Sequence, residues 1–320
     1  TQGRGFWILD DMTPLRHVSN APDDDLRIYP VRTATRSSAQ QGAGHYRRDH
    51  VFGAMLPTAM KAQNPPEGAT FYFSVPEGLG SRAQLRIREA DGDSVRTFPT
   101  VRIEPGLNRF TWNLRYPGSS QGGAAARAVP GLYSVEIEAG DHTAQAEFEV
   151  RMDPRLAEEI TVADLQAQFD FLMDARARLN ELGDALAGLR QVREEAGEHT
   201  ANTSIATVRS AAIEVERTLT AVEQSLIQTE GAGFANPSRL RSHIQFVMTA
   251  ASAQRGEYLD ARPTEQLSER LGDLEVELDA TLIELERVYS DELGELNERL
   301  REAGLDEIEA PPVRRRRVVS

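Results

Sequence analysis

The chain has 320 residues and no cysteine, which excludes disulfide bonds, thiolate metal sites and cysteine nucleophiles. Hydrophobic residues make up 40% and charged residues 27%, the values of an ordinary globular protein, and no apolar run is long enough to span a membrane. Residues 151–310 contain 33 acidic and 16 basic side chains, a net charge of −17, whereas the first 150 residues sum to −1. An acidic half repels nucleic acid and anionic lipid, so the charge argues against nucleic-acid binding.

The chain opens on an aromatic, strand-forming run, FWIL, at residues 6–9. Gly3 and Gly5 precede this run, and Asp10 and Asp11 end it. No initiator Met, basic segment or apolar signal segment stands before it. An amino terminus is usually polar and loosely held. We therefore expect Thr1 to be a cut end, and the strand to belong to something larger upstream.

Connecting segments are expected next. Residues 20–25, NAPDDD, form a turn cluster, and residues 26–31 form a short strand broken by Pro30. Residues 33–66 show little periodicity and are rich in Ser, Gln, Gly, Ala, Asn and Pro. Such a segment usually runs over the surface of another domain or lines a site. We therefore assign 1–30 to a terminal strand and connector, and 31–66 to an irregular linker.

Residues 67–152 are expected to form an all-β domain because their apolar positions alternate. Strands are predicted at 70–75, 83–88, 95–98, 108–114, 133–137 and 144–150. Asp91-Gly92-Asp93 and Gly140-Asp141 are turn signals between them. About six or seven short strands with regular turns are typical of an immunoglobulin-like sandwich.

After Asp153 the period changes to 3.6, which predicts helices over residues 153–310. Thr161 is expected to cap the first helix, with Asp164 in place of the usual Glu of a capping box. Asn236-Pro237 begins a third helix, and Pro263 or Thr264 begins a long fourth one. The apolar stripes are Leu165, Leu172, Leu179 and Leu186; Ile205, Val208, Ala212, Val215, Leu219, Val222 and Leu226; Leu240, Ile244 and Val247; and Leu267, Leu271, Leu274, Leu278, Leu282, Leu285 and Leu296. This spacing favours an antiparallel helical bundle whose Arg and Glu side chains are solvated.

The last segment, residues 311–320, contains the basic run Arg314-Arg315-Arg316-Arg317 after two prolines. A disordered terminus is the simpler interpretation of this tail. The alternative is a contact with an anionic surface or with the acidic helices themselves.

Four motifs occur in a characteristic order: GRGFWILDDMTPLR at 3–16, NPPEGA at 64–69, GLNRFTWNLR at 106–115 and PGLY at 130–133. Together they resemble the carboxy-terminal part of the bacterial sortilin-like β-propellers known as glycosyl hydrolases with neuraminidase-type repeats. The resemblance covers residues 1–190, and in that family the first motif closes the propeller. Here Gln2 stands in place of the usual His, and Met12 in place of an aliphatic residue. The blades with their S-x-D-x-G-x-T-W repeats are absent from this sequence.

The resemblance implies an immunoglobulin-like (FlgD-like) β-sandwich followed by an antiparallel α-helical bundle, both attached to a propeller upstream. It also implies export to the periplasm or beyond the cell. The partners it implies are the upstream propeller of the same protein, and a protein or a glycan.

Two groups of residues near the amino terminus could carry chemistry. Asp10 and Asp11, with Arg4 and His17, could act as acid and base, although carboxylates that end a strand more simply satisfy turn amides. The run at residues 23–25, DDD, could ligate calcium but lacks the spaced carboxylates and glycine of a calcium loop.

The linker and the helices offer two possible metal clusters. His45, Asp49 and His50 are suitable metal ligands, but the adjacent arginines disfavour a cation. A di-metal bundle needs Glu-x-x-His pairs, and the residue three before His199 is Ala196. We therefore assign no metal site and no cofactor.

Other catalytic signatures do not identify a site. No nucleophile elbow, phosphate loop or zinc-protease motif occurs in the sequence. Trp7 and Trp112 could stack on sugars, but both lie on alternating strands, which favours burial in a core. We therefore assign no catalytic residue.

Three functions remain open. The first is a non-catalytic accessory region that caps a sortilin-like propeller or holds partners. The second is a contribution, through residues 33–66, to a sialidase-like glycoside-hydrolase site completed by the propeller. The third is a helical module that oligomerises through the leucine stripes.

Overall fold

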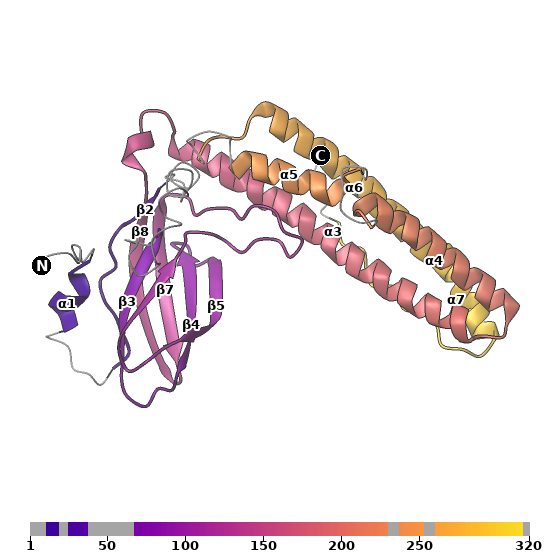
Figure 1. Cartoon of the computed structure of the whole chain (residues 1–320), viewed down its shortest axis with the longest axis horizontal. Helices are drawn as coiled ribbons and strands as arrows, with labels where there is room; N and C mark the ends of the chain where they lie inside the picture. The colour runs from indigo at the N-terminus through magenta and orange to yellow at the C-terminus, as the bar shows by residue number, and fades with distance from the viewer. Residues whose placement is uncertain (1–10, 19–24, 38–66, 230–236, 253–259, 316–320) are drawn as a thin grey trace, which may run out of the picture. The chain divides into compact units, whose positions relative to one another are not determined.

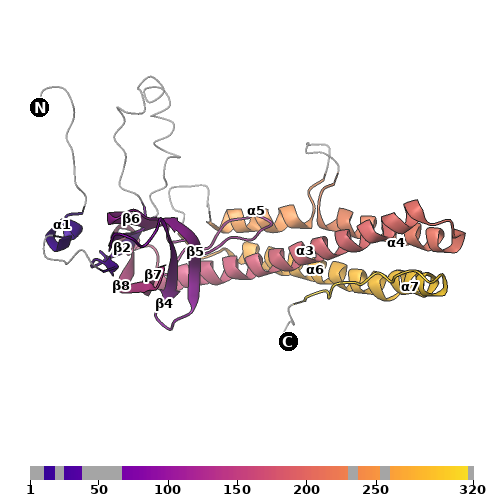
Figure 2. The same cartoon turned by 90° about the horizontal axis from the view of Figure 1, so that it is seen from below.

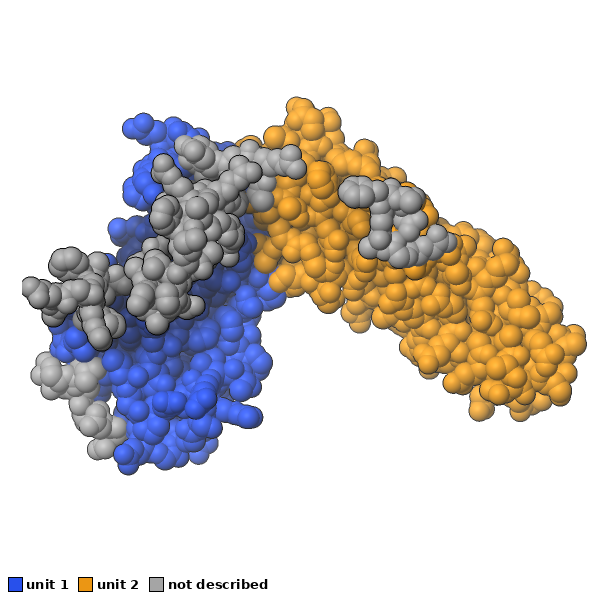
Figure 3. Space-filling model, in the orientation of Figure 1, with its two compact units in different colours: residues 1–117, 126–169, 255–261 blue, residues 118–125, 170–254, 262–320 orange. Residues whose placement is uncertain are grey.

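The computed structural model describes residues 11–18, 25–37, 67–229, 237–252 and 260–315. The chain divides into two compact units, coloured separately in Figure 3. Unit 1 comprises residues 1–117, 126–169 and 255–261, and unit 2 comprises residues 118–125, 170–254 and 262–320. All described strands precede the long helices, so the expected order of a sheet region followed by a helical region is confirmed.

The strands of unit 1 form two sheets (Figure 1). The described strands are β1 (Arg27–Ile28), β2 (Ala34–Arg36), β3 (Ala69–Val75), β4 (Arg82–Glu89), β5 (Ser94–Arg102), β6 (Gly106–Trp112), β7 (Gly131–Ala139) and β8 (His142–Met152). One sheet has the order β1-β3-β6 and the other the order β2-β8-β7-β4-β5. Neighbouring strands are antiparallel except β2 and β8, which run parallel.

The two sheets share a core because alternate side chains of each strand point to the same face. Phe73 and Val75 of β3 pack there with Ala83 of β4 and Ile137 of β7. The aromatic residues of β3 and β6 also meet those of β7 and β8. The ring centroids of Trp112 and Tyr133 are 5.7 Å apart.

Trp112 lies wholly inside this core, as its place on an alternating strand predicts. Its indole N–H donates to the backbone oxygen of Arg115, at 3.1 Å. Gly68 allows its own backbone to lie close to the backbone of Trp112. This glycine has a φ of +115°, and a Cβ there would lie 1.9 Å from the backbone oxygen of Trp112. Only glycine fits that position without a shift of the backbone.

The sheets extend further toward the amino terminus than the expected domain boundary at residue 67. β1 comes from the expected connector and pairs with β3, and β2 comes from the expected linker and pairs with β8. Leu26 and Tyr29 are also buried in the core of unit 1. The described parts of residues 25–37 therefore belong to the sheet region.

The helices are α1 (Thr13–Val18), α3 (Val162–Asn202), α4 (Ala206–Leu226), α5 (Leu240–Ser252), α6 (Glu265–Ser290) and α7 (Glu292–Glu302), with a 3-10 turn at Pro154–Leu156. The 41 residues of α3 make a helix about 60 Å long at 1.5 Å per residue. Within unit 2, α4 packs against α6 and α7, and α5 packs against α6 (Figure 2). None of the helices among the described residues combines the length and the hydropathy needed to cross a membrane.

Two helices begin where the sequence predicts. The Asp164 amide donates to the Thr161 hydroxyl at 3.2 Å, and the Thr161 amide donates to the Asp164 carboxylate at 3.0 Å. This reciprocal pair is a capping box with Asp in place of Glu. Thr264 caps α6 through the amide of Leu267.

The predicted apolar stripes are buried with few exceptions. Leu165, Leu172, Leu179 and Leu186 of α3 are each at most 3% exposed. Ile205 is instead 38% exposed, because it precedes the first turn of α4. The long fourth helix is interrupted at Asp291, but hydrogen bonds from Asp291 to Arg287 and from Glu295 to Asp291 continue across the break. The interruption is therefore confined to one residue.

The start of the basic tail lies on the helices of unit 2. Ile308 is buried, and the side chain of Asn297 bonds both its backbone N–H and its backbone oxygen. Pro311 lies against Gly188 of α3. The guanidinium of Arg315 is 2.8 Å from the carboxylate of Glu286. As far as Arg315 the tail thus follows the expected alternative, a contact with the acidic helices.

Candidate functional site: a buried arginine–aspartate cluster

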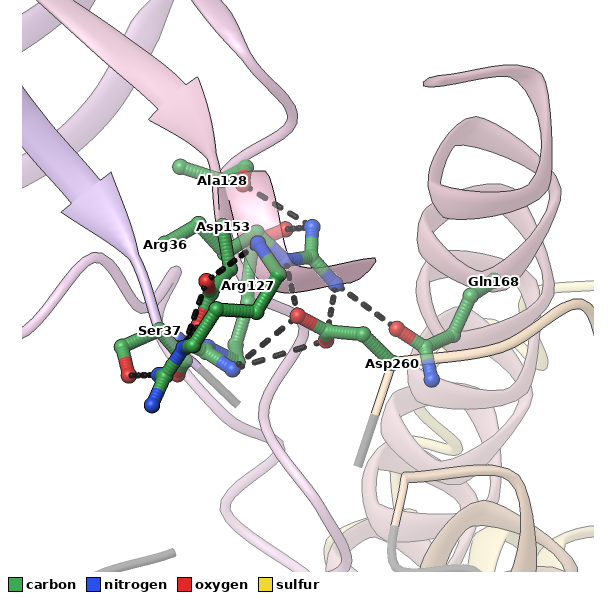
Figure 4. Close-up of polar contacts among 8 residues, drawn as sticks. Arg36, Ser37, Arg127, Ala128, Asp153, Gln168 and Asp260 are labelled. Atoms are coloured by element: carbon green, nitrogen blue, oxygen red, sulfur yellow. Dashed lines mark hydrogen bonds and ion pairs between the residues drawn. The ribbon is translucent and has the colours of Figure 1, made fainter. Parts of the chain in front are cut away.

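Arg36, the last residue of β2, is a charged side chain in the interior of unit 1 and is only 1% exposed. Its Nε and Nη2 bind the two oxygens of Asp260 at 3.1 and 2.7 Å (Figure 4). Nη2 also donates to Oε1 of Gln168 in α3, at 2.7 Å. Nη1 donates to the backbone oxygens of Ala128, at 2.9 Å, and Arg127, at 3.3 Å.

These contacts use the full hydrogen-bonding capacity of the guanidinium. An arginine has five N–H groups, and Arg36 makes five hydrogen bonds to four residues. The paired bonds to Asp260 are the bidentate arrangement that planar guanidinium and carboxylate groups favour. Arg36 therefore retains no N–H donor for a ligand.

A second arginine completes the cluster from the segment between β6 and β7. Nη1 of Arg127 is 3.4 Å from both carboxylate oxygens of Asp260, and Nη2 donates to the backbone oxygen of Ser37 at 2.7 Å. Burial lowers the pKa of Arg127 to about 10, and the positive charges of Arg36 and Arg115 act in the same direction. Arg127 therefore remains protonated at neutral pH, and the buried carboxylate of Asp260 contacts two guanidinium groups.

The arrangement binds segments of unit 1 that are far apart in sequence. Arg36 and Asp260 are separated by 224 positions, and Gln168 lies between them in the chain. A buried ion pair lowers the free energy of the fold only when its hydrogen bonds are complete, and here they are. The cluster therefore holds backbone segments together. Its side chains are bonded to one another or to the backbone, so none of them serves as an acid, base or nucleophile.

Unit 2 contains two similar ties, that is, buried ion pairs that connect two helices. Arg178 of α3 is buried, pairs with Glu181 and Asp279, and donates to the backbone oxygen of Glu275 at 2.9 Å. These bonds connect α3 with α6.

Glu223 of α4 is buried and accepts hydrogen bonds from Arg190, at 2.6 Å, and Arg193 of α3. Burial alone would raise the pKa of Glu223, but these two hydrogen bonds outweigh it and hold the pKa below its ordinary value of 4.5. Glu223 is thus a charged tie between α3 and α4.

A shallow hollow of about 570 Å³ lies beside α4. It is lined by Thr200 of α3 and by Ile213, Glu216, Arg217, Thr220, Ala221 and Gln224 of α4. The Thr200 hydroxyl donates to the Glu216 carboxylate at 2.5 Å, and Arg217 pairs with Glu214. Its charged groups therefore already pair with neighbours within the helices.

The described residues that could have carried chemistry are held in structural roles. Asp11 accepts a hydrogen bond from the amide of Thr13 at 2.8 Å, which confirms that it satisfies a turn amide. The strand expected before it, at residues 6–9, lies outside the described residues. His17 stacks on Tyr29, and Asp25 lies 3.5 Å from the imidazole of His142. No group of three or more His, Asp or Glu suited to a metal ion occurs in the described part of the chain.

Several predicted candidates lie outside the described residues. These are Arg4, Trp7, Asp10, Asp23, Asp24, His45, Asp49, His50, Arg316 and Arg317. Their interpretations therefore stay predictions.

The sequence did not reveal the buried ionic ties. Arg178 and Glu223 were expected to be solvated like the other charged residues of the helices, but each lies next to a stripe position, Leu179 and Val222, that turns inward. No local pattern marks Arg36, because its partner is distant in the sequence.

Comparison with known proteins adds no assignment: no protein-family model matches the chain, and no curated protein matches it significantly.

Proposed function

We propose that the chain is a non-catalytic accessory region of a sortilin-like propeller protein, serving as a structural cap and as an interaction surface. The observation that carries this proposal is that the buried charged side chains of the described residues are bound to one another or to the backbone, above all Arg36 with its five hydrogen bonds. Within the part of the chain that the structure describes, Arg36, Arg178, Glu223 and Asp260 hold segments of the chain together.

We infer that the sheet region is an immunoglobulin-like sandwich. In such domains, strands A, B and E face strands C, F and G, with further strands added at the edges. The strand order β1-β3-β6 of one sheet is the order expected for strands A, B and E, and the neighbours β8, β7 and β4 of the other sheet follow the order G, F and C. Tyr133, near the start of β7, donates its hydroxyl to the backbone oxygen of Val129 at 2.7 Å. This bond corresponds to the tyrosine corner found at the start of strand F.

The helical region is proposed to be an antiparallel bundle. Residues 203–205 join α3 to α4, and a short connection of this kind usually joins antiparallel neighbours. The ties from Arg178 to Asp279 and from Glu223 to Arg193 connect α3 with α6 and with α4. The leucine stripes are used inside this region, which argues against oligomerisation through them.

The propeller attachment and the export of the parent protein rest on the resemblance of residues 3–16 and 106–115 to the sortilin-like family. Reading the coding sequence upstream of Thr1 tests them. A reading frame that continues through repeated S-x-D-x-G-x-T-W turns supports the attachment. A start codon directly before Thr1 would refute it.

The absence of catalysis is tested by incubating the purified chain with fluorogenic sialosides and other aryl glycosides, beside an active sialidase as positive control. We expect no release of the fluorophore above the buffer rate. Reproducible turnover that co-purifies with the chain would overturn the proposal.

A further inference from the structure

The outer face of α6 carries an apolar stripe that the described structure leaves uncovered. Val276 is 71% exposed and Ile283 is 51% exposed, seven residues apart. Gly272 and Ala280 are also exposed, so Gly272, Val276, Ala280 and Ile283 follow the i, i+4, i+8 and i+11 spacing of one helix face. The buried leucines of α6, such as Leu274 and Leu278, lie on the opposite side. The label α6 in Figure 2 marks this helix.

Gly272 has no role in the described packing. A Cβ added at this residue would meet nothing within 4 Å. Glycine inside a helix costs roughly 1 kcal/mol relative to alanine, so the fold of the chain alone favours alanine here. A glycine at an exposed stripe position is explained if another backbone approaches it closely.

Acidic side chains lie on both sides of the stripe. Asp273, Glu277 and Glu284 follow one side, and Glu275, Asp279 and Glu286 the other. Four of them pair with arginines of the chain: Asp273 with Arg270, Asp279 with Arg178, Glu284 with Arg287 and Glu286 with Arg315. Across α6 there are eight acidic and two basic side chains, a net charge of −6. The chain itself places a cation at this border, since Arg315 pairs with Glu286.

The apolar stripe and its acidic borders together indicate which class of molecule can bind to this face of α6. A second copy of α6 would bring acidic borders against acidic borders, and like charges at such positions oppose pairing. An anionic lipid surface is repelled for the same reason. A helix with an apolar seam bordered by Lys and Arg matches both the stripe and its charges.

We propose that the outer face of α6, centred on Val276 and Ile283, binds a basic amphipathic helix of a partner protein. The inference rests on the proposed function of the chain as an interaction region and names the class of partner. The seam residues of the partner pack against the stripe, its backbone approaches Gly272, and its Lys or Arg side chains lie along the acidic borders, where the net charge of α6 is negative.

The test uses the full chain and a fluorescent synthetic peptide of about 18 residues, five helical turns, with Leu at the seam and Lys beside it. Fluorescence anisotropy should show saturable binding that weakens as salt rises. A peptide with Glu in place of Lys, and a scrambled peptide of the same composition, should not bind.

Variants separate the stripe from the rest of the surface. Ile283→Glu should weaken binding about tenfold or more, because it places a charge at the centre of the contact. Ile213→Glu is the matched control, since Ile213 is also half exposed, at 50%, but lies on α4. It should change the affinity less than about twofold.

A glycine variant gives an independent readout. Gly272→Ala should raise the thermal unfolding temperature of the chain and yet weaken peptide binding. Gly294→Ala, on α7, is the control, because a Cβ at Gly294 also meets nothing within 4 Å. It should stabilise the chain without changing the affinity.

Equal affinity of the Ile283→Glu and Ile213→Glu variants would overturn the inference, and so would equal binding of the Glu peptide. Light scattering that shows a dimer dissociated by Ile283→Glu would also overturn it, in favour of a second copy. The peptide assay does not depend on turnover, so loss of this inference leaves the activity test of the proposed function unaffected.

Discussion

At the scale of single residues, the cluster around Asp260 shows how an interior accommodates charge. Two arginines and one aspartate are removed from water, and the free energy lost with hydration is offset by bidentate pairing and by backbone oxygens. The stability of the cluster depends on Asp260, because both arginines contact its carboxylate. Its removal leaves Arg36 and Arg127 close together without that counter-charge.

We therefore expect Asp260→Ala to destabilise the chain by about 3–5 kcal/mol, the cost of leaving a buried charge without its partner. Urea unfolding followed by tryptophan fluorescence measures this change. Combining it with Arg36→Met should restore part of the stability, because the paired substitution removes the stranded cation as well.

Arg86→Gln serves as the control for this experiment. Arg86 pairs with Glu136 and Glu138 on the exposed face of the sheet, where water screens the ion pairs. The control should unfold at nearly the wild-type urea concentration. If Asp260→Ala unfolds there too, the cluster does not stabilise unit 1.

Which residues could be foreseen depends on how far apart their partners lie. Thr161 and Asp164 are three positions apart, and local sequence predicted their reciprocal bonds. Trp112 was assigned to the core from alternation along its own strand. Arg36 and Asp260 became a pair only through the fold, which no local pattern encodes.

At the scale of helices and strands, periodicity predicted the long elements but not the short strand β2. The stripes of α3 to α6 extend over several turns, so each repeats its spacing often enough to be recognised. The two residues of β1 lie within the short strand expected at 26–31, whereas the three residues of β2 are too few to show an alternation. Their place in the sheets follows from pairing with β3 and β8, and this is why the expected boundary at residue 67 came too late.

The ion pairs of Glu223 between α3 and α4 predict how the stability of the fold depends on pH. Glu223 has a pKa below its ordinary value of 4.5, so its carboxylate stabilises the folded state fully above that value. The contribution is lost as the pH falls through the lowered pKa of the folded state. At pH 7, Glu223→Gln should cost about 1–3 kcal/mol, because Arg190 and Arg193 lose a charged acceptor.

Urea unfolding of the wild type and of the Glu223→Gln variant between pH 7 and pH 3 provides the measurement. The difference between the two proteins should stay constant down to about pH 4.5 and then shrink. Glu214→Gln, which breaks an exposed pair with Arg217 on the same helix, should show little difference at any pH. A Glu223→Gln difference that is independent of pH would contradict the charged tie.

At the scale of the whole molecule, unit 1 is assembled from three separate stretches of chain. The sheets take β1 and β2 from residues 25–37 and the remaining strands from residues 69–152. Gln168 comes from the first turns of α3, and Asp260 from the segment before α6. A domain boundary drawn from local composition therefore cuts through hydrogen bonds that the fold needs.

Fragments of the chain test this organisation. The fragment 67–152, with the bounds expected from the sequence, lacks β1 and β2 and leaves the edges of β3 and β8 open. The fragment 25–169 keeps both sheets, Arg36 and Gln168 but lacks Asp260. Because β2 adds a strand and Leu26 and Tyr29 add buried apolar side chains, we expect 25–169 to unfold at a clearly higher urea concentration than 67–152. Both fragments contain Trp112, so tryptophan fluorescence reports on each. The full chain should unfold at a higher urea concentration than 25–169, because only the full chain contains Asp260, the counter-charge to Arg36 and Arg127. For the same reason, Arg36→Met should stabilise the fragment 25–169 but destabilise the full chain. Equal midpoints for the two fragments would show that residues 25–37 are dispensable to the sheets.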